Sequence, residues 1–220
     1  MDDSLINMIV AEVKKTLQDT GSQGVNGNSN SIPLGVSNRH IHITEGTFKK
    51  LFGQNTEFEV MRPLYQPGEF ASKHVVTVVG PKQRPIAGVR ILGPMRNYDQ
   101  VEVSLSDAVV LGINPPVVNS GTLDEACPLT LVGPAGSVYL KHCAIVASRH
   151  IHMTSQHAAQ FGVKEGDFCK VRVSGVKSTT FENVLVRVND AWKLQIHLDT
   201  DDANAANIRT ETDVEFIGKM

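Results

Sequence analysis

The chain has 220 residues, of which 41% are hydrophobic and 20% are charged, and its formal net charge is −2. This composition is ordinary for a globular protein, and the small net charge argues against nucleic acid or an anionic membrane as a partner. No apolar run approaches the ~20 residues that a membrane-spanning helix needs. The acidic start, Met1-Asp2-Asp3, is unlike a secretory signal. The three cysteines form no CxxC pair, so we expect reduced thiols in a cytoplasmic protein.

The first 31 residues predict an amphipathic helix followed by a flexible linker. Apolar residues repeat at helical spacing over residues 4–19, with Leu5, Ile9 and Val13 on one face. Residues 21–31 read GSQGVNGNSNS, a polar run that cannot bury enough surface to order itself. Because an isolated helix this short is marginal in water, we predict that residues 1–20 dock on another protein. Packing against its own domain is the alternative.

Residues 32–220 are predicted to be mainly β. Segments rich in alternating or β-branched residues are separated by turns that contain glycine and proline. These segments cover residues 74–79, 100–105, 169–174, 183–189 and 193–199. Helical stretches are expected only at about 44–52, 154–161 and 201–207. Short strands at this spacing indicate β-barrels or sandwiches.

One motif occurs twice in the chain. Residues 37–44 read SNRHIHIT and residues 147–154 read ASRHIHMT. Each copy follows an apolar strand and precedes a short helical stretch that ends in Phe-Gly. This duplication predicts two related barrels.

Each copy of the motif places two histidines on one face of a strand. His40 and His42 are two residues apart, as are His150 and His152, and side chains two apart in a strand leave the same face. Such a pair is a natural chelate for zinc or a similar divalent ion. One HxH pair is a weak signal, but two copies in a duplicated context predict metal binding.

Each histidine pair needs at least a third ligand. Glu102 and His197 both lie between apolar residues of a predicted strand, on the face that a ligand would occupy. A lone glutamate or histidine on a strand is more often simply solvated. The competing imidazoles are those of His74, His142 and His157.

Arginines accompany these candidate ligands. Arg96 lies six residues before Glu102 in a Gly-Pro turn, where its guanidinium could bind phosphate in a bidentate manner; a surface arginine is the alternative. Arg39 and Arg149 precede the histidine pairs and, by strand alternation, point away from the histidines, which predicts structural roles or contacts to cofactor phosphates. The chain has no GxSxG or Walker motif, so the chemistry is expected to come from metals.

Taken together, several motifs resemble the PduL-type phosphotransacylases, the phosphate propanoyltransferase family. They are RHIHIT, RHIHMT, QPGEFAS (66–72), VRILGPMRNYDQVEVS (89–104) and HLDTDDANAA (197–206). The resemblance covers residues 32 to about 218 and implies a mainly β fold of two related β-barrels with short capping helices. It also implies a discontinuous organisation, with residues 32–45 and 146–220 in the first barrel and residues 46–145 in the second.

The resemblance further implies roles for individual residues. Two divalent metal ions, with zinc the leading candidate, would be held by His40, His42 and Glu102 and by His150, His152 and His197. Arg96 would be the catalytic residue that binds phosphate and stabilises the transition state. Coenzyme A would contact Ser37, Arg90, Leu92 and Asn204, with His197 nearby.

The implied reaction interconverts a short-chain acyl-CoA, propanoyl-CoA or acetyl-CoA, plus phosphate with acyl phosphate plus coenzyme A. The helix over residues 1–20 resembles the encapsulation peptide of family members packed inside bacterial microcompartments. This implies a cytoplasmic homo-oligomer inside such a compartment, bound to its shell or core proteins. The alternatives are a metal-dependent hydrolase of a thioester or phosphate substrate, and a non-catalytic shell-binding module with structural metals.

Overall fold

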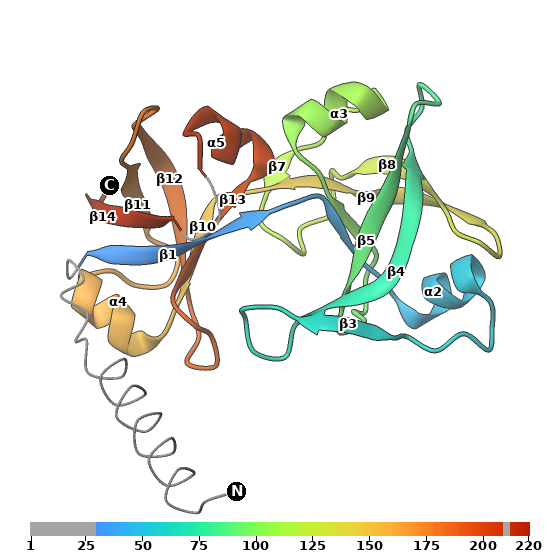
Figure 1. Cartoon of the computed structure of the whole chain (residues 1–220), viewed down its shortest axis with the longest axis horizontal. Coiled ribbons are helices and arrows are strands. Elements are labelled where there is room, and N and C mark those ends of the chain that lie inside the picture. The colour runs from blue at the N-terminus through green and yellow to red at the C-terminus, as the bar shows by residue number, and fades with distance from the viewer. Residues whose placement is uncertain (1–29, 209–211) are drawn as a thin grey trace, which may run out of the picture. The chain divides into compact units, whose positions relative to one another are not determined.

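Two β-barrels make up most of the chain (Figure 1). The computed structural model describes residues 30–208 and 212–220, so the predicted helix and nearly all of the predicted linker lie outside the described residues. Residues Ile32–Met220 form one unit. Among the residues described, no helix is both long and apolar enough to cross a membrane.

The first barrel is a closed ring of strands from both ends of the described chain. In order around the ring, its strands are β1 (Ser31–Ser37), β13 (Gln195–Asp199), β10 (His150–Met153), β12 (Thr179–Val188), β11 (Phe168–Val173) and β14 (Asp213–Lys219).

The second barrel closes in the same way from the middle of the chain. Its ring runs through β9 (Ser137–Ala147), β6 (Gln100–Glu102), β2 (His40–His42), β5 (Pro85–Gly93), β4 (Phe70–Val79) and β8 (Cys127–Val132). Two further strands flank the ring: β3 (Val60–Pro63) pairs with β4, and β7 (Val117–Val118) pairs with β9. The predicted mainly β fold with two barrels is confirmed.

The two rings repeat one pairing pattern. β1 runs parallel to β13, as β9 does to β6, and β10 runs parallel to β12, as β2 does to β5. β10 is antiparallel to β13, as β2 is to β6, and β11 is antiparallel to β12 and β14, as β4 is to β5 and β8. The duplication predicted from the histidine motif therefore extends to the strand pairings around both barrels that these comparisons cover.

The strand before each histidine motif belongs to the other barrel. The chain leaves the first barrel after β1 and enters the second at β2; it leaves the second after β9 and returns to the first at β10 (Figure 1). The predicted boundaries after residues 45 and 145 are therefore wrong. The crossings fall at Asn38-Arg39 and Ser148-Arg149. β2 forms its backbone hydrogen bonds with β5 and β6 of the second barrel, and β10 forms its own with β12 and β13 of the first.

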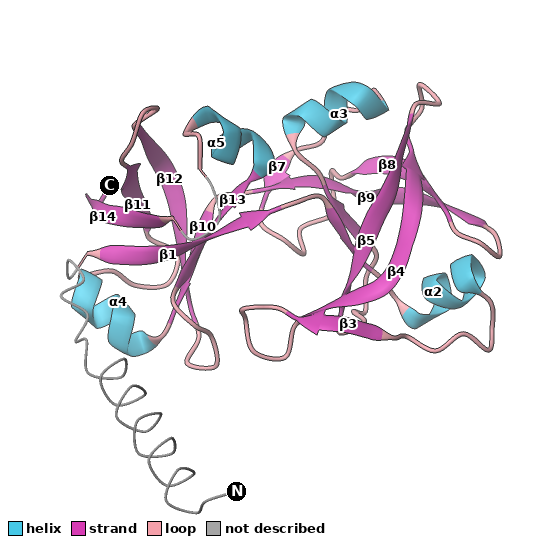
Figure 2. Cartoon of the chain, in the orientation of Figure 1, coloured by secondary structure: helices cyan, strands magenta, loops and turns pink. Residues whose placement is uncertain are grey.

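Short helices follow equivalent strands in the two barrels (Figure 2). The helices α2 (Glu45–Phe52) and α4 (Ser155–Phe161) follow the histidine strands, and α3 (Leu105–Leu111) and α5 (Thr200–Ala205) follow β6 and β13. Three of these helices were predicted. The fourth, α3, replaces the end of a predicted strand because Ser104 caps its first turn and Asp107 closes the capping box.

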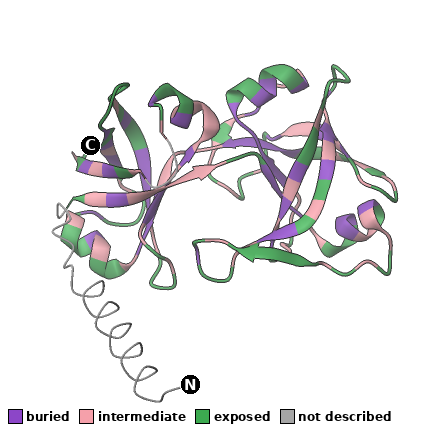
Figure 3. Cartoon of the chain, in the orientation of Figure 1, coloured by how far each residue is buried: buried purple, intermediate pink, exposed green. Residues whose placement is uncertain are grey.

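The barrel interiors explain why the histidines point outward. Ile41 and Ile151, the central residues of the two motifs, are completely buried among apolar side chains inside their barrels. Burying one such side chain contributes about 1.5–3 kcal/mol, which fixes the face that each strand presents to the core. Buried and exposed positions alternate along many of the strands (Figure 3). The histidines on either side of each isoleucine must therefore leave the outer face of the barrel.

Candidate metal centre and active-site cavity

One cavity of about 580 Å³ is lined by residues of both barrels. It contains Arg96, the predicted coenzyme A contacts Ser37, Arg90 and Leu92, and all six predicted metal ligands: His40, His42, Glu102, His150, His152 and His197. Asn204 is not part of the lining. It is exposed on α5, where its carbonyl oxygen accepts a hydrogen bond from Lys177 Nζ at 3.1 Å.

In the second barrel, a buried group of two histidines and one carboxylate faces the cavity. His40 lies opposite Glu102 in the antiparallel pair of β2 and β6, and His42 follows on the same face. The potential ligand atoms of these three residues lie within 4.8 Å of one another. His40 Nδ1 is 2.9 Å from the carbonyl oxygen of Asn38, which orients the ring and leaves Nε2 for a ligand.

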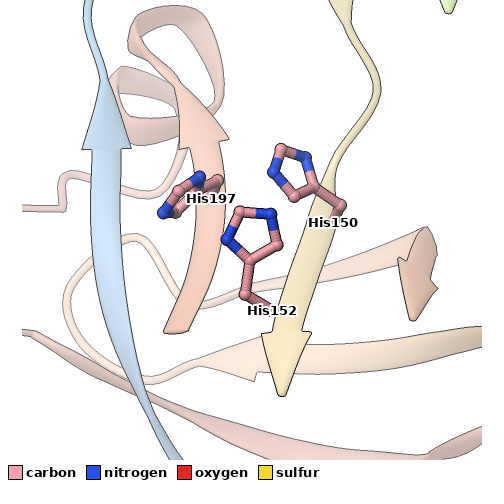
Figure 4. A group of neighbouring side chains, drawn as sticks. All are labelled: His150, His152 and His197. Carbon is pink, nitrogen blue, oxygen red and sulfur yellow. The ribbon is translucent and has the colours of Figure 1, made fainter. Parts of the chain in front are cut away.

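In the first barrel, the equivalent group consists of three histidines. His150 lies opposite His197 in the antiparallel pair of β10 and β13. Figure 4 shows the three imidazoles converging from these two strands, and their potential ligand atoms also lie within 4.8 Å of one another. His150 Nδ1 is 2.8 Å from the carbonyl oxygen of Ser148, the contact that His40 makes with Asn38 in the other barrel.

Several nitrogen atoms in these groups are suited to a metal. Within the described residues, both ring nitrogens of His152 and Nδ1 of His42 are buried without a hydrogen-bond partner. Leaving a buried polar group unpaired costs about 1–3 kcal/mol, so such atoms need an explanation. A divalent ion would provide one, because imidazole nitrogen and carboxylate oxygen are both zinc ligands. The residues present fit the implied metals.

The protonation states of these groups also suit a metal. Burial, together with the neighbouring histidine of each pair, lowers the pKa of His42 and of His152 to about 3. Burial likewise lowers the pKa of His197 well below its usual value. For Glu102, burial alone would raise the pKa, but His40 and His42 lower it, and the net direction is down. His42, His152 and His197 are thus neutral and Glu102 is ionised at neutral pH, the forms that bind metals.

A second repeated segment, which the sequence analysis missed, supplies the third member of each group. Residues 100–107 read QVEVSLSD and residues 195–202 read QIHLDTDD, so that Glu102 and His197 occupy the same place. Each segment begins with a buried glutamine that contacts this residue: Gln100 Nε2 donates to Glu102 Oε1 at 2.8 Å, and Gln195 Oε1 lies 2.8 Å from His197 Nε2. Aligning the two halves of the sequence would have found it.

The same segment ends in an aspartate that holds the arginine before each histidine pair. Arg39 contacts Asp107 through Nε at 2.9 Å and Nη2 at 2.7 Å, and Arg149 contacts Asp202 through the same atoms at 2.8 and 2.7 Å. These bidentate ion pairs tie each crossing segment to the helix that follows the third residue of each group. They support the structural reading of Arg39 and Arg149.

Arg96 is fixed in the cavity by contacts at both of its ends. Its backbone N–H donates to the carbonyl oxygen of Ile43 at 2.9 Å, and its Nη2 donates to Glu69 Oε1 at 2.9 Å. Its Nε is buried and has no hydrogen-bond partner among the described residues. The guanidinium is therefore held in a fixed position at the cavity. Its charge also contributes, after burial and His40, to the low pKa of His42.

Two further residues position the three-histidine group. Gly35 lies opposite His197 in the parallel pair of β1 and β13, and a Cβ atom there would lie 2.8 Å from Gln195 Nε2. Gln66, in the segment between β3 and β4, is buried and donates to Gln195 Oε1 at 3.3 Å and to the carbonyl oxygen of Lys193 at 3.1 Å. Gln66 thereby joins the second barrel to the supporting residues of the first.

The profile of the phosphate propanoyltransferase family matches residues 33–209, which include every residue of both groups. The chain belongs to this family. It is 43% identical to a phosphate propanoyltransferase of Lachnoclostridium phytofermentans, over 94% of this chain and 96% of that protein. It is 44% identical to relatives of the same name from Priestia megaterium, over 96% and 94% of the two chains, and from Thermotoga maritima, over 81% and 85%.

As a member of the phosphate propanoyltransferase family, the chain is a phosphate acyltransferase, or phosphotransacylase. Its thiols do not suit an acyl-cysteine mechanism, because none of the three cysteines lines the cavity. Burial raises the pKa of Cys143 and of Cys169 to about 12, so both remain protonated at neutral pH. The positions of the cysteines are consistent with direct attack by phosphate on the acyl group.

Proposed function

We propose that the chain interconverts a short-chain acyl-CoA plus phosphate with acyl phosphate plus coenzyme A at a two-metal centre. One divalent ion would be held by His40, His42 and Glu102, and the other by His150, His152 and His197. The observation that carries the proposal is that two ligand groups occupy equivalent positions of duplicated barrels and line the same cavity. Zinc suits these nitrogen and oxygen donors.

When bound, the two ions would supply positive charge that offsets the charge of phosphate and polarises the thioester carbonyl. The protein's part is to bind and orient phosphate and the thioester, and to stabilise the charge that develops during the reaction. A phosphate oxygen attacks the thioester carbonyl carbon, so that a C–O bond forms, the C–S bond breaks, and coenzyme A leaves as its thiolate. The guanidinium of Arg96, which lines the cavity, would bind the phosphate and stabilise the oxyanion that develops during attack.

Coenzyme A would enter along the lining residues Ser37, Arg90 and Leu92. Arg90 is oriented by its Nη1, which donates to the carbonyl oxygen of Ser72 at 2.7 Å. Asn204, outside the cavity, would contact a part of coenzyme A that lies beyond the reacting centre. The names of the relatives favour propanoyl-CoA as the acyl donor, with acetyl-CoA as the second candidate.

The decisive assay follows thiol release from propanoyl-CoA and acetyl-CoA with and without phosphate, and measures acyl phosphate in the same samples. We expect thiol and acyl phosphate in equal amounts, and only when phosphate is present. Equal thiol release without phosphate would instead identify the metal-dependent hydrolase. A metal-loaded protein without turnover would identify the shell-binding module.

We also propose that residues 1–20 direct a homo-oligomeric enzyme into a bacterial microcompartment in the cytoplasm, through its shell or core proteins. The amphipathic pattern at 4–19 and the polar run at 21–31 support this proposal. Because β1 begins at Ser31, the truncation that tests it should start at Asn30. The truncated enzyme should keep its activity and lose co-purification with compartments. An inactive or unfolded truncation would assign the segment to the catalytic unit instead.

A further inference from the structure

One partly buried arginine of the cavity has no partner for its charge. Arg187 lies on β12 and lines the cavity, but no carboxylate lies within ion-pair distance of it anywhere in residues 30–208 and 212–220. Arg96 is paired with Glu69 and Arg39 with Asp107. The two remaining cavity arginines also differ from Arg187. Arg90 donates a hydrogen bond to a backbone carbonyl group, and Arg62 is exposed.

The position of Arg187 is set by strand register. It lies directly beside His152 in the parallel pair of β10 and β12, where paired residues share a face of the sheet. The preceding pair, Ile151 and Val186, is buried in the barrel interior, so Arg187 and His152 both point out of the barrel and into the cavity. The positive charge of Arg187 adds to burial and to His150 in lowering the pKa of His152.

Trp192 holds Arg187 without using its hydrogen-bond donors. The Arg187 guanidinium carbon lies 5.2 Å from the centroid of the Trp192 ring, within cation–π distance. The same ring stacks on His152, with ring centroids 4.3 Å apart and an angle of 29° between the planes. Contact with a ring face restrains a guanidinium while its N–H groups stay available. No protein acceptor takes up these N–H groups among the residues described.

Each group of candidate ligands has a cation near it. The charge of Arg96 acts on His42, and the charge of Arg187 acts on all three histidines of the other group. Of these two cations, only Arg96 is neutralised by a carboxylate. A partly buried guanidinium with free donors beside a candidate metal ligand is suited to binding an anion.

We propose that Arg187 is a second phosphate-binding residue, which donates hydrogen bonds to the phosphoryl group of inorganic phosphate or acyl phosphate. The inference rests on the proposed function, in which this phosphoryl group reacts beside the histidine groups. Coenzyme A also carries phosphates, but its pantetheine arm separates them from the thioester. A residue beside His152 is therefore placed for the reacting phosphate and not for those of coenzyme A.

The test compares the KM for phosphate and the KM for acyl-CoA in Arg187→Gln, Arg187→Lys and the wild-type enzyme, with metal content measured for each. Arg187→Gln should raise the KM for phosphate about tenfold or more, as expected for a lost charge-assisted hydrogen bond, with the KM for acyl-CoA nearly unchanged. Arg187→Lys keeps the charge but not the planar fork, so it should show a smaller rise. If Arg187→Gln does not fold, Arg187→Lys still allows the KM for phosphate to be compared with that of the wild-type enzyme.

Trp192 provides a readout that does not depend on turnover, because it is the chain's only tryptophan. Inorganic phosphate added to the metal-loaded enzyme should change its fluorescence in a saturable manner, and Arg187→Gln should shift saturation to higher phosphate concentrations. Arg172→Gln, which removes an exposed arginine from β11 of the same barrel, is the control and should behave like wild type.

An unchanged KM for phosphate in both Arg187 variants would overturn the proposal. So would a rise confined to the KM for acyl-CoA, which would assign Arg187 to coenzyme A. Failure of the proposed function looks different, since the wild-type enzyme would then lack stoichiometric metal or release thiol without phosphate.

Discussion

Glu102 occupies in the second barrel the position that His197 occupies in the first. Each lies directly opposite the first histidine of a pair, and each is contacted by a glutamine two residues earlier on its own strand. The duplicated groups therefore differ at one residue, with an anionic carboxylate in one and a neutral imidazole in the other. If both bind divalent ions, the three-histidine group leaves more positive charge uncompensated, which favours placing the anionic phosphate near it.

This equivalence predicts how Glu102 variants will bind metal. Glu102→Ala should lower the metal content from about two ions per chain to about one, since the three-histidine group is separate and stays complete. Glu102→His should retain more metal than Glu102→Ala, because the other barrel already uses a histidine at this position. Elemental analysis of the purified variants checks both. Two ions per chain in Glu102→Ala would show that the carboxylate is not a ligand.

Arg96 is expected to act in turnover and not in folding. Arg96→Ala should keep the fold and the metals but lose roughly 100-fold or more in kcat, the usual scale for a contact to transition-state charge. Arg96→Lys should restore little, because an ammonium group cannot reproduce the planar fork of donors. Steady-state kinetics with metal content measured in parallel tests this. Arg39→Ala is the comparison. It should lower stability, because Arg39 is paired with Asp107, or lower the apparent affinity for CoA.

Gly35 predicts a metal defect without a change at any ligand. A Cβ atom at this position would lie 2.8 Å from Gln195 Nε2 and 3.2 Å from His197 Cδ2. Gly35→Ala should therefore displace the glutamine and the imidazole and weaken metal binding about tenfold, a typical effect of disturbing a residue that orients a ligand. Competition with a chelator measures it. The matched control is Gly46→Ala on α2, where a Cβ atom meets nothing within 4 Å.

The buried histidines predict that the metal-free protein loses stability in acid. The pKa of His42 and of His152 is about 3 in the folded state, against about 6.5 for an unperturbed histidine. The unfolded chain therefore binds more protons between these values, and the free energy of unfolding should fall as the pH is lowered below about 6.5. Urea unfolding of metal-free protein at pH 7, 6 and 5 measures the slope.

His152→Ala should make this slope shallower, because one of the groups that the folded state keeps unprotonated has been removed. His142→Gln, at an exposed position on β9, should leave the slope as it is. Equal slopes in the wild-type protein and His152→Ala would show that His152 is not the source of the acid sensitivity.

The candidate site could be predicted largely from local pattern. Strand alternation alone places His40 and His42, and His150 and His152, on one face, and the buried isoleucine between them confirms that face. The same argument made Glu102 and His197 candidate third ligands, and the family resemblance implied their assignment to the two groups. Gln100 and Gln195 were missed because the residue that each contacts differs between the two halves, which hides the repeat.

The exchange of strands between the barrels could not be predicted in this way. Only two residues separate β1 from β2, and nothing local indicates that the two strands belong to different barrels. Their pairing is decided by strands far along the chain, β13 for the one and β5 and β6 for the other. The role of Arg187 also depends on this long-range register, since its neighbour His152 lies on another strand.

The most direct test of the two-metal centre is elemental analysis of active enzyme purified without chelator. We expect about two divalent ions per chain, mainly zinc, and a parallel loss and recovery of phosphate-dependent thiol release when the ions are removed and restored. Full activity in a preparation without stoichiometric metal would contradict the two-metal centre, and the clustered histidines would then need another explanation.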